Sequence, residues 1–306
     1  MDMTRGNFVC GAALGASALV AAGIAGTGTA RAESTAVDAA AAGASAASEQ
    51  VEADESFEFD YEFDGVKTKT VRIQSGENEL IGTLQAPSSI SERPTTIIFM
   101  LHGAKGTRKS DIFDNLGFAL AKDGYAMARF DFHGHGDSEG EFGDSTVETN
   151  LLDMDQIVVW AKGLSWCNGL AIIGHSVGGA ESAMYAARNP ELFNAVMLIS
   201  PALNIAETSS GILAGTAERL SYMSDAYVED GSKFDVFEAI GGYDSPICIV
   251  HGTQDTAVSY EYSLRLFEML DCCDLHLLAG AAHVPNDRIP EIYSIAKEFF
   301  GRTIAQ

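Results

Sequence analysis

Positively charged side chains are scarce in this chain. Its 306 residues include 19 Lys and Arg against 43 Asp and Glu, which gives a formal net charge of −24 at pH 7. A surface this acidic repels the phosphate groups of nucleic acids and anionic lipids. The composition therefore argues against a nucleic-acid partner, and solubility is a sufficient explanation of the negative charge.

Cysteine is also scarce, and its spacing excludes a common kind of metal site. The chain has 5 Cys, and they do not form the paired CxxC pattern of structural zinc sites. Cys248 lies in an apolar, strand-like run and is interpreted as a small core residue. A disulfide between Cys167 and either Cys272 or Cys273 stays open for a protein outside the cytosol. The stretch DFHGHGDSEGEFG has no matching ligand set elsewhere, so we expect neither a metal nor a cofactor.

The first 32 residues are interpreted as an export signal. Arg5 precedes a Gly- and Ala-rich apolar stretch that ends in small residues at Ala32, where cleavage is expected. The stretch resembles a twin-arginine signal, with Phe8 in place and Gly6 where the second arginine would stand. An uncleaved membrane anchor is the alternative, because the apolar run reaches the roughly 20 residues that a spanning helix needs. The sequence thus predicts an exported protein, whether secreted, periplasmic or bound at the cell surface.

Large apolar side chains are nearly missing from residues 33–55. The segment consists mostly of Ala, Ser, Glu and Asp, and such a segment cannot bury enough surface to offset the entropy of ordering it. We interpret it as a disordered linker. The folded domain is expected to cover residues 56–306.

The pattern of the domain is that of an α/β protein. It opens with alternating stretches that predict antiparallel strands: FEFDYEF, KTKTVRIQ and ELIGTLQAP. Short, continuously apolar runs follow, which predict strands buried on both faces: TTIIFML, YAMARFD, LAIIGH, AVMLIS, PICIVHG and LHLLAG. Helical patterns separate most of them. We therefore predict a mostly parallel, doubly wound, eight-stranded sheet with antiparallel N-terminal strands, and ligands at the carboxyl ends of its strands.

Two segments of the domain carry more detailed expectations. Ser145 and Glu148 stand three residues apart before an apolar helical pattern, which predicts a capping box. Residues 204–243 separate two strand-like runs and are too many for an ordinary connection. We expect this segment to form a small helical cap over the strand ends.

A serine between a strand-like run and a helical pattern predicts a nucleophile. In AIIGHSVGGAES, Gly174 and Gly178 stand two residues on either side of Ser176. Glycines leave room for the sharp strand-to-helix turn that exposes a serine hydroxyl. The Gly-x-Ser-x-Gly string by itself is a weak signal, but its place at a strand–helix junction makes it a strong one.

A serine hydroxyl needs a base to take its proton. Among the 7 His of the chain, His283 sits just past the last strand-like run, as the chain order Ser…Asp…His requires. His251 and His276 lie within strand-like runs, and the side chain of His175 should point away from its neighbour Ser176. We therefore predict His283 as the base.

The remaining parts of such a site are a carboxylate and an oxyanion hole. Asp255 follows the next-to-last strand by a short loop and is the predicted partner of the base. One oxyanion donor should be the backbone N–H of Val177, and the other that of Ala104, with Gly103 or Lys105 as alternatives to Ala104.

A small basic cluster lies near the oxyanion loop and consists of Lys105, Arg108 and Lys109. It could attract an anionic group of a substrate. A solvated loop is the simpler interpretation.

Five short motifs, HGAKG, DFHGHGDSEG, GHSVGG, HGTQDTAVS and GAAH, occur in this order. They resemble the α/β-hydrolase superfamily, and within it the branch of feruloyl and cinnamoyl esterases, monoacylglycerol lipases and serine aminopeptidases. The resemblance runs from about Phe57 to the C-terminus, and it implies a triad with oxyanion donors at these positions: Ser176, Asp255, His283, Ala104 and Val177. It also implies a serine esterase that cleaves small-molecule carboxylic esters through an acyl-serine intermediate, such as feruloyl, cinnamoyl or short-chain acyl esters. Residues 204–243 are shorter than the insertion of feruloyl esterases and do not match it.

Other functions would use the same residues differently. An aminopeptidase or amidase could bind a substrate ammonium group through the acidic residues of the cap: Glu207, Glu218, Asp225, Glu229 and Asp230. A monoacylglycerol lipase would share the triad. A non-catalytic exported binding module predicts a broken triad, whereas all three residue types are present here.

Overall fold

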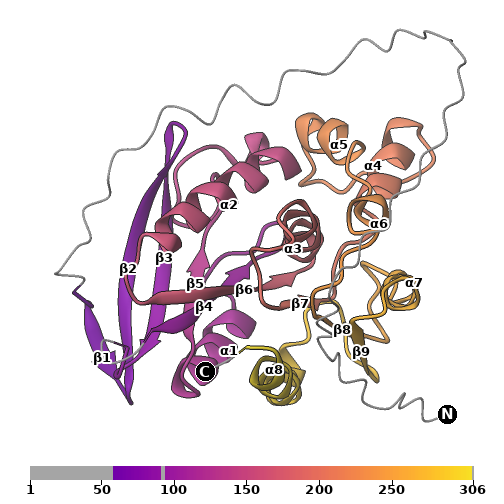
Figure 1. Cartoon of the computed structure of the whole chain (residues 1–306). Coiled ribbons are helices and arrows are strands. Elements are labelled where there is room, and N and C mark those ends of the chain that lie inside the picture. Colours follow the sequence, from indigo (N-terminus) through magenta and orange to yellow (C-terminus); the bar gives the residue numbers. More distant parts are fainter. Residues whose placement is uncertain (1–57, 91–93, 305–306) are drawn as a thin grey trace, which may run out of the picture. The chain divides into compact units, whose positions relative to one another are not determined.

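The computed structural model describes residues 58–90 and 94–304 (Figure 1). The predicted export signal of residues 1–32 and the predicted linker of residues 33–55 lie outside the described residues. In the described ranges, none of the helices combines the length and the apolarity that a membrane-spanning segment requires.

A single mixed sheet organises the described residues, in which nine strands lie in the order β1-β2-β3-β5-β4-β6-β7-β8-β9. The pairs β1/β2, β2/β3 and β3/β5 are antiparallel, and the other pairs are parallel. The bounds are β1 Tyr61–Phe63, β2 Val66–Ser75, β3 Asn78–Pro87, β4 Thr95–Leu101, β5 Ala126–Phe130, β6 Cys167–His175, β7 Val196–Ile199, β8 Ile247–Gly252 and β9 Cys273–Leu278.

The sheet has nine strands, one more than the eight predicted, and its short first strand β1 lies within the alternating stretch FEFDYEF. Asp64 and Gly65 follow β1 with φ values of 47° and 78°. Positive φ at both central residues is what a two-residue hairpin turn requires. The turn folds β1 back so that Tyr61 pairs with Thr68.

Helices cover both faces of the sheet (Figure 1). The main ones are α1 Asp111–Lys122, α2 Val147–Lys162, α3 Val177–Arg188, α7 Glu261–Met269 and α8 Ile289–Thr303, with short helices η1 Phe142–Asp144 and η2 Asn286–Arg288. Helices α1 and α8 share one apolar core, and α2, α3 and α7 share the other. Within β4, Ile97 and Phe99 belong to the second core, whereas Ile98 and Met100 belong to the first. Burial on both faces explains why the parallel strands are continuously apolar.

The capping box of α2 lies one residue later than predicted. Thr146 is the N-cap: its hydroxyl accepts from the Thr149 N–H at 3.2 Å, and the Thr149 hydroxyl accepts from the Thr146 N–H at 2.8 Å. Ser145 instead ends η1, and its hydroxyl donates to Asn150 Oδ1 at 3.0 Å. The prediction of Ser145 and Glu148 as the box was therefore wrong, because the short helix η1 moves the start of α2.

Three helices lie between β7 and β8, where every residue is described: α4 Ile205–Leu213, α5 Asp225–Gly231 and α6 Val236–Ala239. Side chains cap two of them. Ser224 Oγ accepts from the Tyr227 N–H at 3.0 Å, and Asp235 Oδ1 accepts from the Phe237 N–H at 2.9 Å. Such caps stabilise helices this short.

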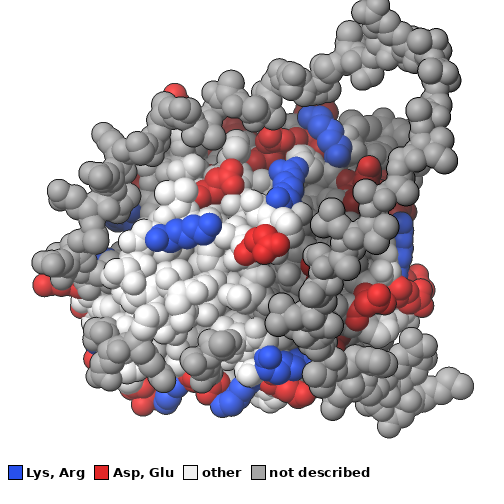
Figure 2. All heavy atoms as spheres, in the orientation of Figure 1, with Lys and Arg blue, Asp and Glu red and all other residues white. Residues whose placement is uncertain are grey.

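Acidic and basic side chains both occur on the face seen in Figure 2, where they leave a broad uncharged area between them. Some of the charges form exposed ion pairs, such as Lys122 with Asp64 and Arg72 with Glu79. Exposed pairs of this kind contribute only about 0–1 kcal/mol each. The fold therefore depends mainly on its two apolar cores.

Candidate active site

Loops at the carboxyl ends of neighbouring parallel strands bring the predicted site residues together. Ser176 follows β6, Asp255 follows β8, and His283 follows β9, while the loop with Ala104 follows β4. The carboxyl ends of parallel strands meet at one edge of a sheet, which is the usual ligand position in such folds.

Ser176 occupies a sharp turn between β6 and α3. Its φ and ψ are 57° and −121°, and a positive φ costs a residue other than glycine about 1–3 kcal/mol. A Cβ on Gly174 would lie 2.3 Å from the carbonyl oxygen of Gly178, and one on Gly178 would lie 2.4 Å from that of Leu101. Both glycines are therefore required by lack of space around the serine.

His283 connects Ser176 to Asp255. Its Nε2 lies 2.9 Å from Ser176 Oγ, and its Nδ1 lies 2.7 Å from Asp255 Oδ2. The Asp255 side chain is fully buried, whereas that of His283 is 21% exposed. Since Nδ1–H donates to the carboxylate, Nε2 is left as an acceptor for the serine proton.

The carboxylate of Asp255 is held at both oxygens. The N–H groups of Ala257 and Val258 donate to Oδ1 at 2.8 and 2.9 Å, and His251 Nε2 lies 3.0 Å from Oδ2, the oxygen that His283 also contacts. Burial by itself would raise the pKa of Asp255, but hydrogen bonds from His251, His283 and Val258 hold this pKa below its ordinary value. Asp255 is therefore ionised at neutral pH.

His251 is a site neighbour that was not predicted, because its position within a strand-like run argues against the role of base. The turn after β8 brings it to Asp255: the Asp255 N–H donates to the carbonyl of Gly252 at 3.2 Å. The spacing of four residues in HGTQD is the signal that could have indicated this contact.

The loop after β4 passes directly beside Ser176. A Cβ on Gly103 would lie 2.7 Å from Ser176 Cβ. The Gly103 carbonyl accepts from the Gly106 N–H at 2.9 Å and from His102 Nδ1 at 2.9 Å. Because a trans peptide places its C=O and N–H on opposite sides, the Ala104 N–H points away from these two donors. This loop supplies the candidate oxyanion donor.

His102 is held in one tautomer by its surroundings. The Phe132 N–H donates to its Nε2 at 3.1 Å, so the ring proton must be on Nδ1. Burial, together with nearby His135, lowers the pKa of His102 to about 4. The ring therefore stays neutral at physiological pH, and the loop keeps its conformation.

His175 contacts His283 rather than Ser176. Its Nε2 lies 3.0 Å from the carbonyl oxygen of His283, and the centroids of the two rings are 5.2 Å apart. Burial lowers the pKa of His175 to about 4. A neutral Nε2–H that donates to this carbonyl fixes the backbone of His283.

A pocket opens between the β4 loop and the start of α3, and Val177, the residue after Ser176, is part of its wall. Its empty volume is about 370 Å³, part of it open to solvent. The lining includes Ala104 and Val177, and Tyr222, Ser224 and Tyr227 come from the segment between β7 and β8. Aromatic and polar groups complete the wall: His102, Phe132, His135, Phe142, Ser145 and Asn150.

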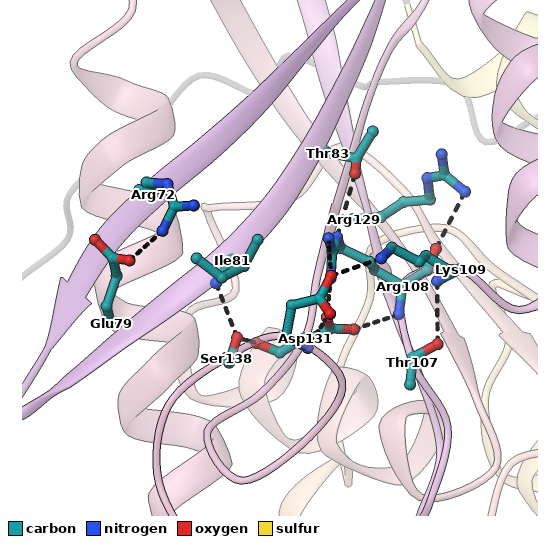
Figure 3. A network of polar contacts seen from close by, with 11 residues as sticks. Arg72, Glu79, Ile81, Thr83, Thr107, Arg108, Lys109, Arg129, Asp131 and Ser138 are labelled. Carbon is teal, nitrogen blue, oxygen red and sulfur yellow. Dashed lines mark hydrogen bonds and ion pairs between the residues drawn. The ribbon is translucent and has the colours of Figure 1, made fainter.

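The basic cluster is not uniformly solvated, because Arg108 is buried, and Figure 3 shows the polar contacts that it makes. Its N–H donates to Asp131 Oδ1 at 2.6 Å, its guanidinium pairs with the same carboxylate, and it reaches Asp137 at 2.7 Å. Lys109 is exposed and pairs with Asp137 at 2.6 Å. Lys105 extends toward the segment between β7 and β8, with Nζ 5.6 Å from the ring centroid of Tyr222. The solvated-loop interpretation was therefore wrong for Arg108.

Two other expectations concern cysteines and metals. Cys167 and Cys273 are both free thiols, so Cys167 forms no disulfide with the other cysteines that the structure describes. Cys248 is fully buried in the core, where burial raises the pKa of its thiol. Throughout residues 58–90 and 94–304, no group of three or more His, Cys, Asp or Glu side chains could hold a metal ion.

Comparison with known proteins places this geometry in a family. The model of the family described as serine aminopeptidase, S33, matches residues 92–237. Est1E from Butyrivibrio proteoclasticus, solved with ferulic acid bound, has a TM-score of 0.70 and 28% sequence identity, and the match covers 77% of this chain and 100% of that one. The chain is a member of the α/β-hydrolase superfamily. Mouse alpha/beta hydrolase domain-containing protein 10 shares the fold at 16% identity, with a TM-score of 0.66 and coverage of 76% of this chain and 99% of that one.

Curated relatives of this α/β-hydrolase include lipases. The lysophosphatidylserine lipase ABHD12 of Macaca fascicularis is 26% identical over 226 residues, which are 68% of this chain and 56% of the relative. The same lipase of Danio rerio is 28% identical over 183 residues, which are 56% of this chain and 47% of the relative. The chain thus spans about half the length of the curated relatives it matches.

Proposed function

We propose that this α/β-hydrolase is a serine esterase that cleaves small-molecule carboxylic esters through an acyl-serine intermediate. The observation that carries the proposal is the unbroken chain of contacts from Ser176 Oγ through His283 to Asp255, at 2.9 and 2.7 Å. Nucleophile and base lie within hydrogen-bonding reach, and the base is oriented by a buried carboxylate, as nucleophilic catalysis requires.

The reaction has two halves. Ser176 Oγ bonds to the ester carbonyl carbon while its proton moves to His283 Nε2, and Asp255 stabilises the resulting imidazolium. The N–H groups of Ala104 and Val177 donate to the oxyanion of the tetrahedral intermediate. The intermediate collapses, the ester C–O bond breaks, and His283 returns the proton to the departing alcohol. Water, with His283 again as base, then releases the acid from Ser176.

The direct test is the variant Ser176→Ala, which should lower kcat on a p-nitrophenyl ester by roughly 10⁴-fold or more. Ser200→Ala is a control: Ser200 is buried, it shares with Ser176 a positive φ, here 44°, and within the described residues its hydroxyl has no hydrogen-bond partner. It should keep wild-type activity. A fluorophosphonate probe should label wild-type enzyme but not Ser176→Ala. Wild-type turnover by Ser176→Ala would refute the proposal.

The pocket supports an aryl or short acyl group as the part of the ester that binds beside Ser176. Phe132, Phe142, Tyr222 and Tyr227 contribute rings to its wall. We propose residues 204–243 as the cap that closes this pocket. A series of p-nitrophenyl esters of increasing acyl length, together with methyl ferulate, should give a maximum of kcat/KM at short or aryl acyl groups. A steady rise up to long-chain esters would contradict this.

The acidic residues of the cap segment give little support to the aminopeptidase alternative. Glu207 accepts a hydrogen bond from the Tyr262 hydroxyl at 2.9 Å, and Asp225 pairs with Arg219 at 2.6 Å. Two of the expected ammonium ligands are thus engaged with other side chains. Faster hydrolysis of aminoacyl p-nitroanilides than of matched esters would restore that alternative.

Lys105 supports a second candidate, an ester that carries an anionic group, as in the lysophosphatidylserine lipases that this chain resembles. Lys105 is exposed beside the pocket and, in the part of the chain that the structure describes, forms no ion pair. Lys105→Met should lower kcat/KM several-fold for a negatively charged ester and leave a neutral analogue unchanged. Lys109→Met, which removes a lysine already paired with Asp137, is the control. Equal effects of Lys105→Met on both esters would reject this candidate.

We also propose that residues 1–32 direct export. The support is their sequence alone, with Arg5, the apolar stretch and the small residues before Glu33. Expression of the full chain, cell fractionation and mass determination should yield an exported protein that begins at Glu33. Retention of the full-length chain in the membrane fraction would favour the anchor instead.

A further inference from the structure

His251 and Ser263 extend the polar chain beyond Asp255. Both side chains are fully buried, His251 near the end of β8 and Ser263 in the first turn of α7. His251 Nδ1 lies 2.7 Å from Ser263 Oγ, and His251 Nε2 lies 3.0 Å from Asp255 Oδ2 and 3.1 Å from the carbonyl oxygen of Val258. A carbonyl oxygen can only accept, so Nε2 carries the proton and donates to both oxygens. In the neutral ring, Nδ1 then accepts from the Ser263 hydroxyl, and the two contacts together orient the imidazole.

We propose that His251, oriented by Ser263, is a positioning residue that controls the Asp255 carboxylate and, through it, the base His283. The inference rests on the proposed esterase function. His251 touches no reacting atom, and its effect is confined to the geometry and charge distribution of Asp255.

Two consequences follow from the shared oxygen. First, Oδ2 receives N–H groups from His251 and His283, while Oδ1 receives the amides of Ala257 and Val258, so the carboxylate plane cannot rotate away from His283. Second, the N–H of His251 partly neutralises the negative charge on Oδ2, and this charge would otherwise stabilise a proton on His283 more strongly. Removal of this donor should therefore leave His283 less well oriented but with a greater affinity for its proton.

A merely structural histidine would give a different result. If His251 only joined β8 to α7, its loss would lower stability and activity without changing the pH at which the enzyme loses activity. In the described residues, the other titratable group against His283 is His175, at a ring distance of 5.2 Å. Burial lowers the pKa of His175 to about 4, so it stays neutral between pH 5 and 9, and the acid limb of kcat/KM reports on the pair of His283 and Asp255.

The experiment compares three variants of the full chain with wild type on a neutral p-nitrophenyl ester from pH 5 to 9. His251→Met removes the donor, His251→Gln keeps an N–H near the position of Nε2, and Ser263→Ala removes the group that orients the ring. For His251→Met we expect kcat to fall by about 10-fold or more with little change in KM, and the acid limb to move up by about half a pH unit. His251→Gln should restore the limb and most of kcat, and Ser263→Ala should move the limb in the same direction as His251→Met, with a smaller loss of kcat.

The outcomes separate this inference from the proposed function. Fluorophosphonate labelling of Ser176 in wild type tests the function alone, and the variants are compared only if labelling succeeds. An acid limb that stays at its wild-type position in a folded His251→Met variant overturns the inference, as does a failure of His251→Gln to restore activity. If His251→Met does not fold, Ser263→Ala decides: a wild-type acid limb and wild-type kcat in that variant overturn the inference.

Discussion

A methyl group added at Gly103 should disable the site while leaving the fold largely intact. Its Cβ would lie 2.7 Å from Ser176 Cβ, 3.1 Å from the carbonyl oxygen of His175 and 3.2 Å from Ser176 Oγ, whereas ordinary van der Waals contact begins near 3.4 Å. The loop after β4 must therefore move away from the serine by about 0.7 Å. The φ of Gly103 is not positive, so alanine is excluded by space and not by backbone conformation.

The displacement acts on catalysis more than on stability. The Ala104 N–H belongs to the same loop, and a misplacement of this order can cost about 100-fold in rate. Overpacking by one methyl group typically destabilises by about 1–3 kcal/mol, which corresponds to roughly 2–4 °C in Tm for each kcal/mol. We therefore expect Gly103→Ala to lose about 100-fold in kcat/KM and to melt several degrees lower, yet fully folded at 25 °C.

Steady-state kinetics on a p-nitrophenyl ester and thermal melting followed by circular dichroism measure the two effects. Gly301→Ala is the control, because no atom lies within 4 Å of a Cβ there and the residue belongs to helix α8. It should keep full activity and gain up to about 1 kcal/mol in stability. Wild-type kcat/KM in Gly103→Ala would refute the close approach of this loop to Ser176.

Three further predictions concern stability. Asp131→Asn should lower the free energy of unfolding by about 3 kcal/mol, because the buried guanidinium of Arg108 then keeps only the half-exposed carboxylate of Asp137 as a charged partner, whereas Glu79→Gln should change it by at most about 1 kcal/mol. Urea titration measures both, and equal effects would contradict the burial. Thr146→Ala removes an N-cap and should lower the free energy of unfolding by about 1 kcal/mol, whereas Glu148→Ala should lower it by less. A larger loss for Glu148→Ala in urea titration would instead support the capping box predicted from the sequence. Burial raises the pKa of Glu181 well above its ordinary value, so the folded chain holds a proton that the unfolded chain loses above pH 4.5, and this contribution to stability falls as pH rises. The Tm of Glu181→Gln relative to wild type should therefore rise from pH 5 to pH 8, and a difference independent of pH would show that this carboxyl does not titrate on unfolding.

The order of strands and helices and the convergence of three site residues were predictable from the chain. Continuous apolarity indicates burial on both faces of a parallel sheet, and the carboxyl ends of such strands share one edge. Ser176, Asp255 and His283 each follow a strand, so their proximity follows from topology alone. The family comparisons confirm the α/β-hydrolase fold, while the roles of these three residues stay predictions.

Other features depend on contacts that local sequence does not encode. Arg108 was expected in solvent because it stands between two lysines in the basic cluster, but Asp131, 23 residues later, faces it in the core. The contacts of His251 could not be predicted, because a strand position reveals neither the turn that brings Asp255 to it nor the helix that brings Ser263. Both misjudgements concern polar groups whose burial is set by partners from other elements.

The ion pair between Arg108 and Asp131 also bears on protein engineering. Asp131, in the segment after β5, binds both the backbone N–H and the guanidinium of Arg108, in the segment after β4. These contacts hold the two segments together. If either segment is replaced or randomised by itself, the buried Arg108 or Asp131 on the other segment loses its main ionic partner. A library that aims to change specificity should keep these two positions constant, or exchange both segments together as one cassette.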